Sequence, residues 1–434
     1  MMTDILPLQT AAVRDGTGDR VFRNVLFVVT FLLIWLTATP FVDLGSAGSA
    51  GAANEGNIVG QLATLALTAV MAVFIARQQP HVLMKAVTPI LALTLLWFVL
   101  SSVFSNYPDL SLRRVVLATL TIFHAAVFLL LPPSRNDFGR LLGICALLVL
   151  AVCYAGIAFV PGLSIHQVSD LREPELAGAW RGPFAHKNGA GAGMVLLIFI
   201  GLFAIRTWNR WAGVFIVGLS GIFLIATQSK SPFHLLPIVL LVVWMVGRLR
   251  NPVLAIGLLL LGPAAIGLVT VGSVVFEPVR AFLDEITSDP SFTGRDVIWR
   301  FAIDATLQRP LFGHGFQAFW GTNELLDGWN PQESWGLRAS DAHNGFLNLS
   351  VMTGIVGLAL AVIWIVVQPL IDYFRARSKG SDPALTTLFM RIWLFGLYLA
   401  GFESIFFSGG SAAWFMIVAA IIGLRFQTAY QLRR

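Results

Sequence analysis

Twelve apolar stretches, each close to the length of a membrane-spanning helix, follow one another along this chain of 434 residues. A helix needs about 20 apolar residues to cross the hydrocarbon core of a bilayer. The pattern therefore predicts an all-α polytopic membrane protein with about 12 transmembrane helices. The stretches cover residues 21–42, 57–76, 86–104, 112–131, 141–160, 189–205, 211–227, 232–247, 252–276, 346–370, 385–406 and 411–424.

Basic residues collect in alternate gaps between these stretches. The short gaps in between, 43–56, 105–111, 228–231 and 407–410, contain no Lys or Arg apart from Lys230. Positive charge marks the cytoplasmic side of a membrane protein, so both termini are expected in the cytoplasm. The long polar loops 161–188 and 277–345 are then expected outside. The basic clusters are Arg14/Arg20/Arg23, Arg77/Lys85, Arg135/Arg140, Arg206/Arg210, Arg248/Arg250, Arg375/Arg377/Lys379 and Arg425/Arg433/Arg434.

The composition agrees with a membrane protein, because 56% of the residues are hydrophobic and 12% are charged. The apolar stretches use nearly the whole chain. We therefore expect a single transmembrane domain, 1–434, with residues 277–345 as a loop insertion. The positive charge is scattered over short loops and forms no stripe, which argues against a nucleic-acid partner.

The larger outside loop contains a predicted helix. From Arg295 to Gln308, apolar side chains recur at the spacing of one helix face. Ser291 or Thr293 can cap this helix, and Pro310 is expected to end it.

Aromatic residues are dense in the same loop. They have two interpretations, which the sequence leaves open: an interfacial aromatic belt, or flat platforms for sugar rings. They are Trp299, Phe312, Phe316, Phe319, Trp320, Trp329 and Trp335.

The segment Arg181-Gly-Pro-Phe-Ala-His-Lys-Asn-Gly-Ala-Gly places His186 and Lys187 at the start of a predicted membrane helix. Free N–H groups and the helix dipole favour an anion there. Arg181 could grip that anion in a bidentate fork. The alternative is that the cationic side chains extend to the membrane–water interface and the glycines allow close helix packing.

Two further cations stand at the starts of predicted helices. Lys230, in Gln228-Ser-Lys-Ser, is either a cation at a helix end or part of the site. Arg295, in Thr293-Gly-Arg, lies in the first turn of the loop helix, where a cation opposes the helix dipole. Its unfavourable position suggests that it binds an anion.

The loop re-enters the membrane at Ser340-Asp-Ala-His-Asn-Gly. A lone histidine at this position would be expected to cap the next helix, but in the Asp-x-His-Asn setting we favour His343 as a base near neutral pH that the carboxylate of Asp341 orients. Glu403, near the outer end of a membrane helix, is a further candidate because ionisable groups at membrane depth are costly. The sequence contains no spaced ligand set for zinc and no Asp-x-Asp pair, so we expect no metal and no cofactor.

The motifs occur in one order along the chain, and together they resemble the O-antigen ligase and Wzy-type polysaccharide polymerase superfamily, most closely exopolysaccharide polymerases of the ExoQ type. The matching pieces are Arg181-Gly-Pro-Phe-x-His-Lys-Asn, Gln228-Ser-Lys-Ser, Thr293-Gly-Arg-x-x-x-Trp, Pro310-Leu-Phe-Gly-His-Gly-Phe and Ala342-His-Asn-Gly-Phe-Leu.

The resemblance implies a GT-C-like, metal-independent membrane glycosyltransferase that uses undecaprenyl-diphosphate-linked sugars. It implies that Arg181, Arg295 and His343 are the catalytic residues. Membrane lipid, a flippase and a chain-length regulator are further expected partners. We expect substrate binding by His186, Lys187, Asn188, Lys230, Trp299, Asp341, Asn344 and Glu403.

The expected function is polymerisation of lipid-linked repeat units into exopolysaccharide or O-antigen at the periplasmic face of the bacterial inner membrane. One alternative is ligation of a finished glycan to a lipid or protein acceptor. Another is a transporter or flippase of lipid-linked oligosaccharide, but that class places its polar groups at mid-bilayer on paired halves.

Overall fold

The structure is a computed structural model, and it describes residues 17–37, 40–45, 58–77, 80–171, 173–322 and 339–429. Within these ranges the regular elements are helices, and a single isolated bridge pairs Ile165 with Trp180.

The described helices agree with the predicted apolar stretches one by one, which confirms the all-α polytopic fold. Eight are long and apolar enough to cross a membrane, and α6, α11 and α21 are shorter apolar helices. The helix α2 completes the series. The bounds are α2 Thr17–Leu36, α4 Ile58–Arg77, α6 Pro89–Val103, α7 Pro108–Leu130, α8 Arg135–Phe159, α10 Lys187–Thr207, α11 Arg210–Ala226, α12 Lys230–Arg248, α13 Pro252–Val269, α19 Gly345–Val362, α21 Pro383–Leu399 and α22 Ala412–Ala429.

Proline and capping side chains set where several of these helices begin. Proline is tolerated in the first turn because its missing N–H has no partner there. Pro89 and Pro383 start α6 and α21, and each follows a residue whose side chain accepts from the first free N–H groups, Thr88 and Asp382. Such caps stabilise a helix by about 1 kcal/mol.

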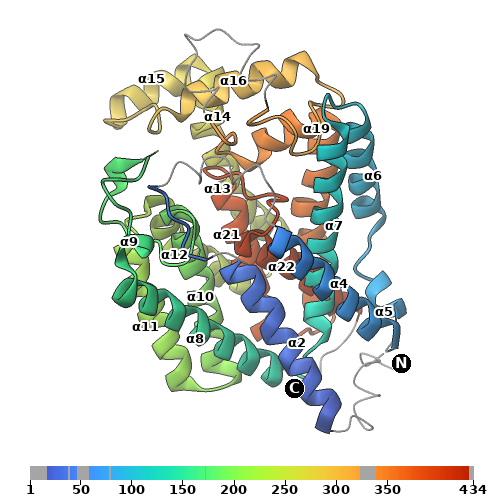
Figure 1. Ribbon diagram of the computed structural model, residues 1–434. Helices are drawn as coiled ribbons and strands as arrows, with labels where there is room; N and C mark the ends of the chain where they lie inside the picture. The colour runs from blue at the N-terminus through green and yellow to red at the C-terminus, as the bar shows by residue number, and fades with distance from the viewer. Residues whose placement is uncertain are drawn as a thin grey trace.

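The bundle has two distinct ends. The loop helices α15 (Glu277–Ile286) and α16 (Arg295–Gln308) lie across one end, and α2 begins at the other (Figure 1). We call these the loop end and the basic end. Ion pairs tie the basic clusters together at the basic end: Arg20 with Asp137 at 3.1 Å, Arg135 with Asp382 at 2.8 Å and Arg425 with Asp372 at 3.1 Å.

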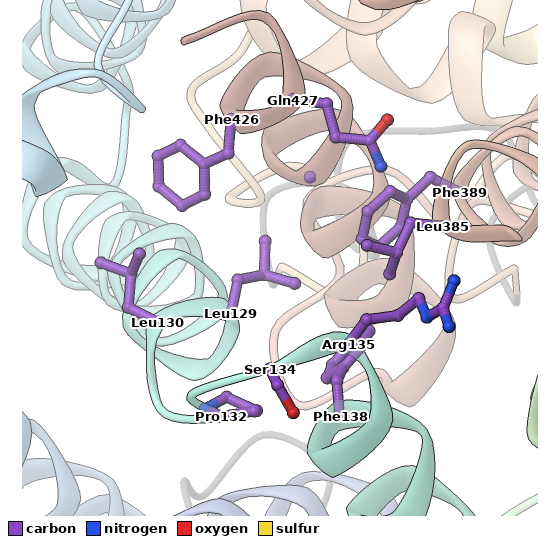
Figure 2. A pocket seen from close by; sticks show the side chains of 11 residues that line it. Leu129, Leu130, Pro132, Ser134, Arg135, Phe138, Leu385, Phe389, Phe426 and Gln427 are labelled. Atoms are coloured by element: carbon purple, nitrogen blue, oxygen red, sulfur yellow. The ribbon is translucent and has the colours of Figure 1, made fainter. Parts of the chain in front are cut away.

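The helices α10, α21 and α22 form the centre of the bundle and are buried along most of their length. A small apolar cavity of about 40 Å³ lies between α7, α8, α21 and α22 at the basic end. Figure 2 shows that Phe138, Phe389 and Phe426 surround it, with Arg135 and Gln427 at its edge. Its lining is mostly apolar and offers no reactive group.

The Pro310-Leu-Phe-Gly-His-Gly motif forms backbone hydrogen bonds with α19 at a break in that helix. Gly354 has a left-handed φ of 71° inside α19 and frees backbone groups there. The N–H of Ile355 donates to the Pro310 carbonyl at 2.8 Å, and the N–H of His314 donates to the Val351 carbonyl at 2.9 Å. This motif is therefore structural, because it joins the end of α16 to α19.

Candidate functional site

Glu403 is the centre of a polar network at the loop end. It lies in the loop after α21, and its side chain is about one-fifth exposed. Its Oε1 accepts from Asn188 Nδ2 at 2.9 Å and from a guanidinium nitrogen of Arg295 at 3.2 Å. Its Oε2 lies 3.7 Å from His343 Nδ1. The structure thus brings together candidate residues from four distant segments.

Arg295 is the first residue of α16, whose observed bounds match the predicted helix. Its second guanidinium nitrogen donates to the Phe402 carbonyl. The expected cap was wrong: Gly294, with a left-handed φ of 79°, precedes the helix without a side-chain cap, and Ser291 instead accepts from the Gly294 N–H. The tight turn points Arg295 toward Glu403.

His343 has a strained backbone and two carboxylate neighbours. Its φ is 46°, a left-handed value that is uncommon outside glycine. Its N–H donates to Asp341 Oδ1 at 2.7 Å, and its Nδ1 lies 3.8 Å from the same oxygen. Burial lowers the pKa of His343, but Glu403 and Asp341 outweigh burial, so its pKa lies above the usual value.

The carboxyl of Glu403 is held in its charged form. Burial alone would raise its pKa, but His343 and Arg295 overcome that effect and leave the pKa below its usual value. Glu403 is therefore an acceptor that can both fix the Arg295 guanidinium and orient the His343 imidazole.

Asn344 differs from the expectation of substrate binding. It is 2% exposed, and its Oδ1 caps α19 by accepting from the N–H groups of Phe346 and Leu347. Its Nδ2 donates to the Gly401 carbonyl at 3.1 Å. Because its side-chain groups are used inside the protein, Asn344 positions its neighbour His343 and the 400–404 loop.

Two histidines occupy the start of α10. His186 Nδ1 accepts from the Asn188 N–H at 3.1 Å, and His166 Nε2 accepts from the Lys187 N–H at 3.3 Å. The other ring nitrogen of each histidine contacts a carboxylate. His186 Nε2 lies 3.0 Å from Glu173 Oε2, and His166 Nδ1 lies 2.9 Å from Asp170 Oδ2. These N–H groups are not free, which corrects the expectation that they bind an anion directly.

The sequence did not predict three residues of this site, His166, Asp170 and Glu173. They lie in an irregular loop, so no repeating sequence pattern indicates that they contact the start of α10. Burial is the main cause that lowers the pKa of His166, which agrees with its role as an acceptor. The hydrogen bond from His186 is the main cause that lowers the pKa of Glu173, and His343 adds to it from a distance. Asn188 donates its backbone N–H to His186 and its side-chain Nδ2 to Glu403, so the pair of His186 and Glu173 adjoins the Glu403 network.

Arg181 also differs from the expectation that its guanidinium grips the anion. The side chain is 1% exposed, and its two terminal nitrogens donate to the carbonyls of Val42 at 2.6 Å and Phe184 at 3.2 Å. Burial lowers the pKa of Arg181, while the carboxylates of Asp170 and Asp43 oppose that shift. Arg181 thus fastens the loop that leads into α10, and no described contact joins it to Arg295.

Asn188 connects the Gln228–Lys230 hairpin to Glu403. Its Oδ1 accepts from the Ser229 hydroxyl at 3.0 Å, while its Nδ2 donates to Glu403. A Cβ on Gly191 would come within 2.8 Å of Ser229 Cβ, so this glycine serves helix packing. Lys230 is exposed at the start of α12, and Lys187 Nζ lies 3.5 Å from the Gln228 carbonyl.

Trp299 corrects another expectation. It has no exposed surface, and its Nε1 donates to the Ala342 carbonyl at 3.1 Å. It therefore packs α16 onto the segment that carries His343 and cannot offer a face to a sugar. Trp329 and Trp335 lie outside the described residues.

Comparison with known proteins gives two similarities. Residues 215–362 match a family model described as O-antigen ligase. A stretch of 130 residues is 30% identical to the exopolysaccharide production protein ExoQ of Rhizobium meliloti (strain 1021) and covers 30% of this chain. The resemblance to the O-antigen ligase and Wzy-type superfamily is confirmed.

The similarity covers part of each protein. It spans 29% of the length of ExoQ, and the family model includes Arg295 and His343 but ends before Glu403. The chain is thus an integral membrane protein, and about a third of it is similar to the O-antigen ligase family model.

Proposed function

We propose that this chain is a membrane glycosyltransferase that polymerises undecaprenyl-diphosphate-linked repeat units at the periplasmic face of the bacterial inner membrane. The observation that carries the proposal is the Glu403 network, which joins Asn188, Arg295 and His343 at the loop end of the bundle. In this proposal the loop end faces the periplasm, both termini are cytoplasmic, and residues 277–345 form an insertion in one transmembrane domain.

The first task of such a site is to stabilise the leaving diphosphate. Breaking the bond between the sugar C1 and the diphosphate oxygen leaves negative charge on the diphosphate, which fixed cations stabilise without reorganisation. Arg295 supplies a guanidinium held in place by Phe402 and Glu403. Lys187 and Lys230 supply ammonium groups from the neighbouring helix starts. We propose that these three cations bind the diphosphate without a metal, and that Arg181 positions Lys187.

The second task is to take a proton from the attacking sugar hydroxyl. Its oxygen forms the new glycosidic bond to C1, and we propose that its proton moves to His343 Nε2. The carboxylates of Glu403 and Asp341 lie on the Nδ1 side of the His343 ring. No described residue forms a hydrogen bond with Nε2, so this nitrogen is available to the hydroxyl. This arrangement resembles a histidine oriented by a carboxylate, with Asp341 and Glu403 as the orienting groups.

Ligation of a finished glycan to an acceptor is the second candidate, and the description of the matched family model as O-antigen ligase supports it. The same cations and base would serve both reactions, because the donors share a lipid diphosphate. The polar groups lie at one end of the bundle, so the site offers no argument for transport through mid-bilayer.

Reconstitution in liposomes with a lipid-diphosphate-linked repeat unit as sole substrate tests the proposal. A polymerase gives a ladder of products, whereas a ligase gives product after an acceptor lipid is added. His343→Gln keeps a hydrogen-bonding side chain but cannot take the proton, so it should abolish transfer and retain donor binding. Normal turnover by this variant would refute the base, and a large loss of donor affinity would place His343 in the diphosphate site.

A further inference from the structure

Arg391 is a charged residue of the central helix α21 that the proposed reaction does not use. From Leu388 to Leu399 it is the one residue of this fully described helix that is not buried. It lies eight residues after Pro383, or ~12 Å along the helix from the basic end. A charge at that depth is costly unless it meets a counter-charge.

Arg391 has no acidic partner among the residues that the structure describes. Its Nε is buried without a hydrogen bond, and the charge that acts on it is another cation, Arg206, at the end of α10. The helices α10 and α21, which carry Arg206 and Arg391, pack against each other, and α12 contacts both of them.

The carboxylates of the basic end are already engaged elsewhere. Among the described residues of that end, Asp19 pairs with Arg23, Asp137 with Arg20 and Arg140, Asp372 with Arg425, and Asp382 with Arg135. The protein therefore brings two cations together and leaves their counter-ion to come from outside.

Exposed tryptophans mark the membrane interface on α11, which packs against α10, and on α12, which contacts α10 and α21. Trp211 is 75% exposed at the start of α11, and Trp244 is 54% exposed near the end of α12. Each lies under a guanidinium, with Arg210 at 5.8 Å and Arg248 at 3.8 Å from the ring centroids. Amphipathic rings sit at the level of lipid headgroups.

We propose that Arg391 and Arg206 form a binding site for the phosphate of an anionic phospholipid in the leaflet at the basic end. The lipid phosphate reaches this depth while its acyl chains stay in the bilayer, whereas a soluble anion would have to leave water. Arg391 is partly buried on the central helix α21 and Arg206 is exposed near the end of α10, so a phosphate between them would be bound by two guanidinium groups.

Native mass spectrometry of the purified chain tests this site with phosphatidylglycerol, phosphatidylcholine and inorganic phosphate as separate probes. The wild type should retain one phosphatidylglycerol in preference to phosphatidylcholine. Arg391→Gln and Arg206→Gln should each weaken that binding about fivefold, the effect of one cation near a charged membrane surface. Arg113→Gln, an exposed arginine at the loop end, should leave it unchanged.

Equal retention by wild type and both variants would overturn the proposal. Full competition by inorganic phosphate would overturn the lipid assignment and make the ligand a soluble anion. If Arg391→Gln fails to fold, Arg206→Gln decides the question, because Arg206 is exposed at a helix end. The proposal is independent of the reaction at the loop end, since lipid binding is measured without substrate.

Discussion

At the residue scale, the site is organised by one carboxylate that three other side chains share. Glu403 contacts Asn188, Arg295 and His343, so its charge fixes a guanidinium and raises the pKa of an imidazole at once. The sequence predicted Glu403 as a site residue because it is an ionisable group near the end of a membrane helix. Residue spacing could not show that Glu403 contacts Asn188, Arg295 and His343 together.

The pKa of His343 gives a prediction for the pH dependence of turnover. A base must be neutral, so activity should fall as the pH drops through the raised pKa of His343. Asp341→Asn removes one charge that raises this pKa and keeps the oxygen that accepts the His343 N–H. The acid limb of the pH–rate profile should therefore move to lower pH in this variant. An unchanged acid limb, with normal folding, would mean that His343 does not control it.

The fork of Arg295 gives a second prediction. Its guanidinium donates to Phe402 and Glu403 through different nitrogens, and Lys cannot reproduce that geometry. Arg295→Lys should lower turnover by about 10²-fold or more, the usual cost of one transition-state donor. Arg300→Lys on the exposed face of α16 is the matched control and should stay near wild type. Equal rates for both variants would remove Arg295 from the diphosphate site.

At the element scale, the sequence predicts the helices well, but it does not predict the long-range contacts that hold the loops against them. The period of apolar residues from Arg295 to Gln308 is local information, and α16 has the predicted bounds. The Pro310-Leu-Phe-Gly-His-Gly motif suggested only a family, because its partner, the break at Gly354, is remote in the sequence. Likewise Arg181 and Trp299 have the residue types of a sugar-phosphate site, yet long-range packing buries both.

The break in α19 predicts that alanine substitution lowers stability at Gly354 but not at Gly257. A Cβ on Gly354 would lie 1.9 Å from the Leu311 carbonyl oxygen, and its φ of 71° disfavours other residues. Gly354→Ala should cost at least about 1–3 kcal/mol from backbone strain alone. Gly257→Ala in α13 meets no atom within 4 Å and should be neutral or stabilising. Thermal unfolding in detergent compares the two, and equal melting temperatures would contradict the docking of the motif.

At the scale of the whole molecule, hydropathy and charge were enough to predict the bundle, because a bilayer demands long apolar helices and internal backbone hydrogen bonds. The basic clusters do gather at one end, where Arg20, Arg135 and Arg425 form their ion pairs. Which end faces the cytoplasm depends on the membrane, so the orientation remains a prediction based on the positive-inside rule.

Labelling of single cysteines in intact cells tests that orientation. The native Cys145 and Cys153 are buried inside α8, so they should contribute little background. Ser288→Cys lies exposed in the loop before α16, and Ser378→Cys lies exposed at the end of α20 (Gln368–Ser378). A membrane-impermeant maleimide should label the first in cells with a permeabilised outer membrane and the second only after the inner membrane is broken. The reverse pattern would place Glu403 and His343 on the cytoplasmic side, where they could not act on a glycan already moved across the membrane.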